Sequence, residues 1–168
     1  MGPSALLRLC LLSTLALHPT LQAPRPLPGV GVQRHECPPG WLELGRRCYG
    51  YFSWELSWRE AQGWCRASCS GCGLASLHGP AEHRALAAFI AQRQRRDDED
   101  EEDVWIGLYR RGRGWRWLGG SDQRCPPRRG DEDSDSSRCA ALEESTGFLS
   151  WEGESCGEKK PFLCQRVQ

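Results

Sequence analysis

The sequence contains no asparagine, and only two of its 22 basic residues, Lys159 and Lys160, are lysines. Without asparagine the chain has no N-glycosylation acceptor. It also lacks one of the side-chain amides that supply oxygen ligands in calcium sites. No stretch beyond the N-terminal region approaches the roughly 18 apolar residues of a membrane-spanning helix. We therefore expect no membrane partner.

The charge balance gives no indication of a nucleic-acid partner. The 22 acidic and 22 basic residues cancel, and removal of an N-terminal signal would take away only Arg8 among them. The remaining chain would carry a net charge near −1. Proteins that bind nucleic acids neutralise phosphates with lysine and arginine, and a surplus of these residues is missing here.

The N-terminal residues have the pattern of a secretory signal peptide. One positive charge precedes a short apolar run from Leu9 to Leu17, and Ala23 is a small residue suited to a cleavage site. Pro24 disfavours cleavage directly after Ala23, and Ala16 is the alternative. We expect a signal peptide over residues 1–23 and a secreted product.

Nine of the ten cysteines follow this signal, and in an oxidising compartment most of them should form disulfides. Because nine is odd, at least one has no partner in its own chain. The span from Cys37 to Cys164 has the size of one domain with one hydrophobic core. We expect a linker without hydrophobic periodicity at 24–36, a domain at 37–164 and a C-terminal tail at 165–168.

Two segments of the domain are predicted to be helices. The first begins after Ser57 and runs to about Ala67, because Ser57 and Glu60 form the S-x-x-E pattern of a capping box. The second begins at Pro80, which is tolerated in a first turn, and ends near Arg96. Three apolar residues at helical spacing give it a buried face: Leu86, Phe89 and Ile90.

After Asp103 the sequence changes to short aromatic-rich segments separated by glycines. The segments VWIGLY, WRWL, CAAL, FLSW and PFLCQRV are predicted to be strands. Residues 119–137 show no hydrophobic period and should form a long loop, a feature that is usually functional or disordered in a compact domain.

Two runs of carboxylates are the main candidates for a binding site. Adjacent carboxylates about 4 Å apart repel by roughly 1 kcal/mol per pair even in bulk water, so such a run is commonly a solvated loop. The alternative is a surface that meets cations, because carboxylate oxygens suit Ca²⁺ and neither run has the glycine-centred spacing of an EF-hand loop. In an extended chain, alternate carboxylates have a spacing comparable with that of cations in a salt lattice. The candidate residues are Asp97, Asp98, Glu99, Asp100, Glu101, Glu102 and Asp103 in the first run, and Asp131, Glu132, Asp133 and Asp135 in the second.

Arginine makes up 20 of the 22 basic residues, and several arginines lie close in sequence to the acidic runs, notably at 110–116. A planar guanidinium can pair bidentately with a planar oxyanion such as carbonate. A gene rich in G and C produces the same bias without any binding role, and the sequence leaves both explanations open. No serine, histidine and acid set has a recognisable catalytic spacing. We therefore expect neither an enzyme nor a cofactor.

The ordered series of these motifs resembles the C-type lectin-like domain. The two helices are followed by VWIGL, WRWLGGS, CAAL, Trp151, Cys156 and PFLC, and the resemblance covers 37–164. It implies an α+β fold of the C-type lectin type, with two helices, two small antiparallel sheets and a long loop. It also implies three disulfides: Cys37–Cys48, Cys65–Cys164 and Cys139–Cys156.

Within that superfamily the segments CYGYFSWELSW, EHRALAAFIAQ and LEESTGFLSWEGESCGEKKPFLC, with the acidic run leading into VWIGL, resemble the avian eggshell matrix group of struthiocalcin, ansocalcin and ovocleidin. This resemblance implies a protein of the extracellular matrix that binds calcium carbonate mineral and modulates calcite nucleation and growth. The alternative is a carbohydrate- or bacterial-surface-binding module of antimicrobial type with the same fold.

The sequence departs from the sugar-binding members of the superfamily. Those members hold calcium with a Glu-Pro-Asn or Gln-Pro-Asp triplet in the long loop and a Trp-Asn-Asp triplet beside a strand. Here the corresponding segments read CPPRRG and WEGESC. No intact lectin calcium site remains, and we expect no calcium-dependent sugar binding.

Three cysteines remain outside the disulfides that the resemblance implies: Cys69, Cys72 and Cys125. Gly71 relaxes the CSGC turn, so Cys69 and Cys72 can approach each other. The alternative joins Cys125 to one of these two. A zinc site at CSGC is disfavoured in a secreted chain. If Cys125 stays unpaired in the long loop, we expect a disulfide-linked homodimer through it.

Overall fold

The computed structural model describes residues 37–95, 102–112, 114–120 and 137–168. The chain divides into two units, Met1–Gln33 and Arg34–Gln168. The predicted signal peptide and linker, most of both acidic runs and Cys125 lie outside the described residues. The described helices and strands all belong to the second unit.

Both predicted helices are present. Helix α1 spans Trp58–Ser68, and its capping box is formed: Ser57 and Glu60 each accept a hydrogen bond from the other's backbone N–H. Helix α2 spans Pro80–Gln94, with proline in its first turn as predicted. The short 3₁₀ helix η1, Glu144–Thr146, was not predicted.

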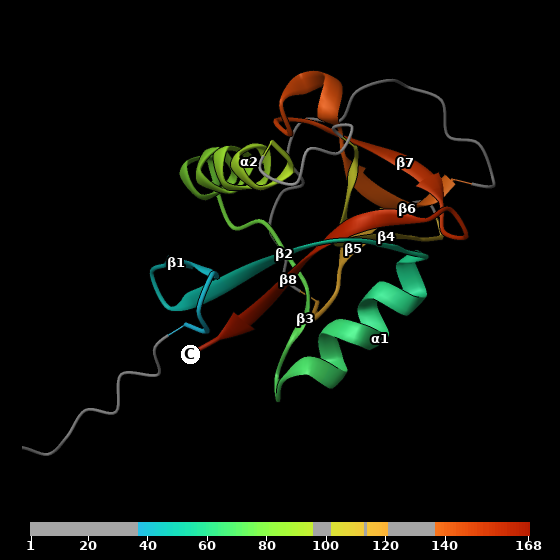
Figure 1. Ribbon diagram of the computed structural model, residues 1–168. Coiled ribbons are helices and arrows are strands. Elements are labelled where there is room, and N and C mark those ends of the chain that lie inside the picture. The colour runs from blue at the N-terminus through green and yellow to red at the C-terminus, as the bar shows by residue number, and fades with distance from the viewer. Residues whose placement is uncertain (1–36, 96–101, 113, 121–136) are drawn as a thin grey trace, which may run out of the picture. The chain divides into compact units, whose positions relative to one another are not determined.

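The strands form one eight-stranded sheet, in which β1-β2-β8-β4-β6-β7 is the order of neighbours (Figure 1). In addition β3 pairs with β8, and β5 pairs with β4. The pairs are antiparallel except for β4 and β8, which meet in parallel at Trp105 and Phe162. This contact joins the two antiparallel parts that the resemblance implied. The bounds are β1 Leu42–Leu44, β2 Arg47–Leu56, β3 Gly73–Leu74, β4 Val104–Arg111, β5 Gly114–Trp117, β6 Ser137–Leu142, β7 Trp151–Ser155 and β8 Lys160–Val167.

One prediction about the chain near its C-terminal end was wrong. The FLSW segment was expected to be a strand, but Phe148 has a φ of 64° and β7 begins only at Trp151. This turn is fixed by buried His83, whose Nε2–H donates to the carbonyl of Phe148 at 2.7 Å. The predicted PFLCQRV strand is present as β8, which includes residues 165–167 of the predicted tail, and its Val167 pairs with Arg47 of β2.

Two hydrophobic cores lie on the two faces of the sheet. Side chains of successive strand residues point to opposite faces, and β8 shows this directly. Leu163 belongs to the core that contains Leu86 and Ile90 of α2. Phe162 belongs to the core that contains Ala61 of α1. The two helices therefore cover opposite faces, as their positions on either side of β2 and β8 in Figure 1 also show.

The three disulfides implied by the resemblance are all present. Cys37–Cys48 attaches the start of the domain to β2, Cys65–Cys164 connects α1 to β8, and Cys139–Cys156 connects β6 to the end of β7. Of the alternatives for the remaining cysteines, the structure contains the Cys69–Cys72 bridge. Gly71 between them has a φ of 76°, a conformation that glycine adopts without strain.

Gly107 of the WIGL segment marks the closest approach of β4 to the chain around β3. A Cβ atom at this position would lie 2.6 Å from the carbonyl oxygen of Leu74, which cannot move without breaking the backbone pairing. We expect Gly107→Ala to lower the free energy of unfolding by about 2 kcal/mol through overpacking. Gly114→Ala is the matched control, since its Cβ would meet nothing within 4 Å. Chemical denaturation of both variants checks this, and equal stabilities would contradict it.

Candidate functional site

The first acidic run connects the end of α2 to the start of β4. Of its seven carboxylates the structure describes two, Glu102 and Asp103. The carboxylates from Asp97 to Glu101, and all four of the second run, lie outside the described residues. The described residues nevertheless show how the last two residues of the first run are attached to the fold.

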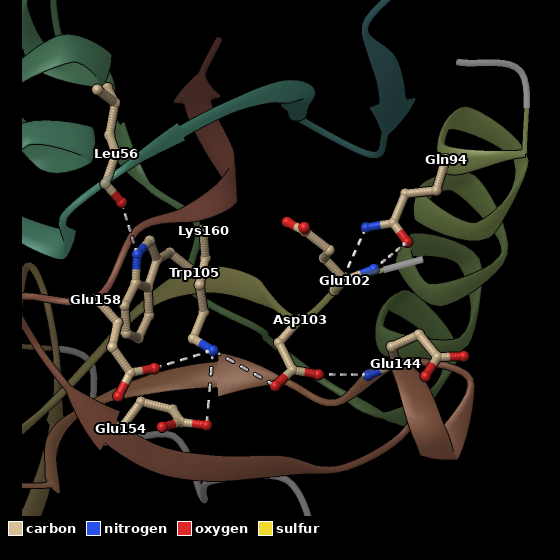
Figure 2. Close-up of polar contacts among 9 residues, drawn as sticks. All are labelled: Leu56, Gln94, Glu102, Asp103, Trp105, Glu144, Glu154, Glu158 and Lys160. Carbon is tan, nitrogen blue, oxygen red and sulfur yellow. Dashed lines mark hydrogen bonds and ion pairs between the residues drawn. The ribbon is translucent and has the colours of Figure 1, made fainter. Parts of the chain in front are cut away.

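Gln94, the last residue of α2, attaches the run to the helix (Figure 2). Its Nε2–H donates to the carbonyl of Glu102 at 2.7 Å, and its Oε1 accepts the backbone N–H of Glu102 at 3.1 Å. Gln94 is only 3 % exposed. The N–H and the carbonyl oxygen of this buried amide are therefore both hydrogen-bonded to the backbone of Glu102. Nothing in the sequence pattern indicated this role, because a glutamine beside an acidic run resembles an ordinary surface residue.

Asp103 attaches the end of the run to two other elements. Its Oδ1 accepts the backbone N–H of Glu144 in η1 at 2.8 Å, and its Oδ2 lies 3.6 Å from Nζ of Lys160 at the start of β8. Both carboxylate oxygens are thus engaged within the molecule. The sequence placed Asp103 among the mineral-binding candidates, and in the structure its carboxylate contacts Glu144 and Lys160 within the fold.

Lys160 lies at the centre of a cluster of carboxylates. Its Nζ is 3.3 Å from Glu158, 3.6 Å from Asp103 and 3.7 Å from Glu154, and its side chain is 15 % exposed. It also lies 5.6 Å from the centre of the Trp105 ring (Figure 2). Burial disfavours the ammonium, but the carboxylates outweigh burial and raise the pKa of Lys160. The rarity of lysine in the sequence was the one available signal for this residue.

Glu154 is the member of this cluster whose charge is most perturbed. Burial is the largest cause, and together with the carboxylates of Glu158 and Glu152 it raises the pKa of Glu154 to about 7, although the ammonium of Lys160 opposes the shift. The hydrogen bond between Glu154 and Glu152 requires a proton on one of the two carboxyl groups. The cluster is thus crowded with negative charge even though it contains a lysine.

The same cluster contains the three acidic side chains that most resemble a metal-binding group in the described part of the chain. Asp103, Glu152 and Glu154 each offer an oxygen atom, and these atoms lie within 4.8 Å of one another. The ammonium of Lys160 already supplies the positive charge there, at 3.6 Å from Asp103 and 3.7 Å from Glu154. We interpret the group as an ion-pair network that holds β4, β7 and β8 together.

Comparison with known proteins supports the assignment from the motifs. The Lectin C-type domain model matches residues 55–166. The chain belongs to the C-type lectin domain family. It is 52 % identical to dromaiocalcin-1 of Dromaius novaehollandiae, over 80 % of this chain and 94 % of that protein. It is 47 % identical to rheacalcin-1 of Rhea americana, over 80 % of this chain and 98 % of the relative.

Solved structures of C-type lectin domains share the fold. The crystal structure of ovocleidin-17, described as a major protein of the calcified layer of the Gallus gallus eggshell, matches with a TM-score of 0.70 at 34 % identity, over 79 % of this chain and all of that one. Human lithostathine also matches with a TM-score of 0.70, at 29 % identity and with the same coverage. Within the C-type lectin family the chain belongs with the avian eggshell group of dromaiocalcin, rheacalcin, struthiocalcin and ovocleidin-17.

Two segments of this chain correspond to the calcium-binding segments of sugar-binding C-type lectins, and the structure describes only one of them. The loop segment CPPRRG lies outside the described residues. The segment WEGESC forms β7 and the cysteine after it, and its Glu152 contacts Glu154 in the Lys160 cluster.

In the described part of the chain no helix is long and apolar enough to cross a membrane.

The crowded cluster makes stability depend on pH in a defined direction. Because the pKa of Glu154 is about 7 in the folded protein against about 4.5 for an ordinary glutamate, folding takes up a proton between these values. The stabilising contribution is complete below pH 4.5 and is lost as the pH rises through 7. Relative to Glu154→Gln, which does not titrate, we expect the melting temperature of the wild type to fall across this range.

Thermal unfolding followed by circular dichroism from about pH 4 to about pH 8 measures this difference. Glu43→Gln is the control, since Glu43 is exposed on β1 and away from the cluster. A wild type and Glu154→Gln variant whose melting temperatures change in parallel would contradict the assignment of the shifted carboxyl to Glu154.

Proposed function

We propose that this protein is secreted into an extracellular matrix, where it binds calcium carbonate and modulates calcite nucleation and growth through its acidic loops. Its similarity to the eggshell C-type lectin-like group supports this function. One relative of this group, ovocleidin-17, is a major protein of a calcified eggshell layer. We assign the protein no catalytic activity, no cofactor and no nucleic-acid partner.

The attachment of the last two residues of the first acidic run is the observation that most supports this function. Its first end follows α2, and its last two residues are bonded to Gln94, Glu144 and Lys160. A run of carboxylates attached to rigid elements can contact many calcium ions of a crystal face at once. Such weak contacts add by avidity, so no individual carboxylate has to bind tightly.

The acidic residues of the two runs have different proposed roles. We assign mineral contact to the carboxylates from Asp97 to Glu102 and to those of the second run, from Asp131 to Asp135. Asp103 has the structural role described above. A crystal face of calcium carbonate also presents anions, for which exposed arginines are suitable partners.

Two such arginines lie on the β4–β5 hairpin. Tyr109 pairs with Arg116 and Arg111 pairs with Gly114, so Arg111 and Arg116 share one face of the hairpin. Both are exposed. We propose that these guanidinium groups contribute carbonate contacts beside the calcium contacts of the acidic runs.

The main test removes nine of the ten proposed calcium contacts and retains the two acidic residues that are bonded within the fold. Replacement of nine carboxylates by serine, from Asp97 to Glu101 and from Asp131 to Asp135, leaves Glu102 and Asp103 in place. We expect this variant to remain folded and its affinity for calcite powder to fall by roughly tenfold or more, because avidity is lost. The double variant Glu43→Ser and Glu55→Ser, which removes exposed carboxylates elsewhere, should adsorb like the wild type. Unchanged adsorption of the nine-residue variant would exclude these runs as the binding surface.

We also propose a disulfide-linked homodimer through Cys125. In the described residues the other eight cysteines of the predicted mature chain are paired with one another. Secreted proteins seldom keep an exposed free thiol, and a second copy is one source of a partner.

On a non-reducing gel we expect the wild type to migrate as a dimer and Cys125→Ser as a monomer. Addition of a reducing agent should convert the wild type to the monomer, since the link is a disulfide. Monomer migration of the untreated wild type would refute the dimer.

A further inference from the structure

The Cys69–Cys72 bridge differs from the other three described disulfides in what it connects. It joins positions that are only 3 apart in the sequence, whereas the others join positions that are 11, 17 and 99 apart. The stabilisation that a disulfide gives through the unfolded chain grows with the length of the loop that it closes. Of the four described bridges, Cys69–Cys72 therefore contributes least to the stability of the fold.

The backbone around this bridge is held by hydrogen bonds that do not involve sulfur. The N–H of Cys72 donates to the carbonyl of Cys69 at 3.2 Å, and this bond closes the turn. Beyond the turn, the N–H of Leu74 donates to Oε1 of Gln62 in α1 at 2.7 Å, and Leu74 pairs with Cys164 of β8. Opening of the bridge therefore frees two side chains and leaves the backbone bonds on both sides of it in place.

The two cysteines of this bridge differ in exposure. Cys69 follows the last residue of α1, is partly exposed, and is followed by the exposed residues Ser70 and Gly71. Cys72 is only 7 % exposed. A thiolate from solvent can therefore reach the sulfur of Cys69, and the sulfur of Cys72 is the one that leaves. Exposed disulfides are the ones that exchange readily with thiols.

The other described bridges are better protected from solvent. Both cysteines of Cys65–Cys164 are fully buried. In Cys37–Cys48 the side-chain amide of Gln168 lies against the bridge, with its Nε2 at 3.4 Å and 3.3 Å from the two sulfur atoms. In Cys139–Cys156 the first cysteine is 2 % exposed, and the second packs against the same hydrophobic core. Each of these bridges also connects separate parts of the fold, so its opening costs more than that of Cys69–Cys72.

A positive charge lies near the exposed sulfur in the sequence. The C-terminal end of a helix carries partial negative charge, which by itself repels an incoming thiolate. Arg66 is exposed and belongs to the last turn of α1, three positions before Cys69. Its guanidinium offsets the partial negative charge of the helix end and favours the thiolate form of a nearby cysteine.

We propose that the Cys69–Cys72 bridge is a thiol–disulfide exchange site, at which another secreted protein with an exposed thiol becomes covalently attached to this chain. The partner's thiolate attacks Sγ of Cys69 and forms a new disulfide with it, while the bond between Cys69 and Cys72 breaks. The electron pair leaves with Sγ of Cys72, which then takes a proton from water. One disulfide replaces another, so the step needs no oxidant. This attachment is independent of mineral binding.

The test measures which bridge opens first. Cys125→Ser removes the one cysteine of the predicted mature chain outside the four bridges, so every thiol that appears comes from a bridge. The folded variant is incubated with reduced glutathione at about pH 8, close to the pKa of an ordinary thiol. Samples are quenched at intervals with N-ethylmaleimide. Peptide mapping then locates glutathione and maleimide on individual cysteines.

We expect the Cys69–Cys72 bridge to open at least about tenfold faster than each of the other three, because its sulfur is exposed. The first product should carry glutathione on Cys69 and maleimide on Cys72. Opening of all four bridges at one rate would show that unfolding controls the reaction, and it would overturn the proposal. Faster opening of another bridge, glutathione on Cys72 in place of Cys69, or no opening of this bridge would overturn it as well.

A pair of double variants in the same background separates reactivity from stability. Replacement of Cys69 and Cys72 by serine should abolish the rapid capture of glutathione. Replacement of Cys37 and Cys48 by serine is the matched control, and it should retain this capture. The first variant should keep a melting temperature roughly 3 °C above that of the control, since the loop that it opens is shorter. A lower melting temperature for the first variant, or rapid capture that persists in it, would overturn the proposal.

Discussion

The parallel contact between Trp105 of β4 and Phe162 of β8 determines much of the arrangement around the candidate site. Parallel strands advance in the same direction, so the residues two positions earlier, Asp103 and Lys160, must also lie close together. Their charged atoms are 3.6 Å apart. Trp105 lies beneath the ammonium and donates its indole N–H to the carbonyl of Leu56 at 2.9 Å. The parallel pairing of β4 and β8 therefore places the ion pair that holds the end of the acidic run.

Local signals in the sequence were sufficient for both α-helices and for four of the eight strands of the described chain, β4, β5, β6 and β8. The Ser57–Glu60 capping box depends only on residues three positions apart, and proline at the start of α2 acts through its own φ angle. Strand β2 was not predicted, because polar and apolar residues do not alternate regularly in its sequence, RCYGYFSWEL. It contains Gly50, against which the ring of Trp41 packs where a Cβ would be.

The candidate site was predicted less completely, for a physical reason. A run of carboxylates is visible in any sequence, but the contacts of Asp103 depend on Lys160 and Glu144, which become its neighbours only when the sheet assembles. His83 of α2 fixes the turn at Phe148, which lies 65 positions away, and no local sequence pattern contains that contact. The role of Gln94 requires only eight residues of separation. Even so, a side-chain amide that hydrogen-bonds to backbone atoms requires no particular residue type as its partner. The sequence therefore contains no pattern that indicates the contact.

The disulfides explain how a small domain tolerates so concentrated a charge. The Cys65–Cys164 bridge spans 99 positions, and a loop of that size stabilises a fold by about 4 to 5 kcal/mol through the entropy of the unfolded chain. Neighbouring carboxylates repel in the unfolded chain as well, so this part of the repulsion cancels when stabilities are compared. Only the additional repulsion caused by joining the ends of the run opposes folding. The hydrogen bonds of Gln94 and the contacts of Asp103 have to offset only this additional repulsion.

The choice of lysine at position 160, in a chain whose cations are otherwise almost all arginines, follows from the geometry of the cluster. A guanidinium is planar and pairs best with one carboxylate through two parallel bonds. An ammonium is compact and directs three donors outward, so it can be shared. Lys160 is shared by carboxylates from three segments: Asp103 before β4, Glu154 of β7 and Glu158 before β8. An arginine would satisfy one of these carboxylates and leave the others as uncompensated, partly buried charges. Arginines are suited to the exposed face of the hairpin, where the proposed partner is a planar anion outside the protein.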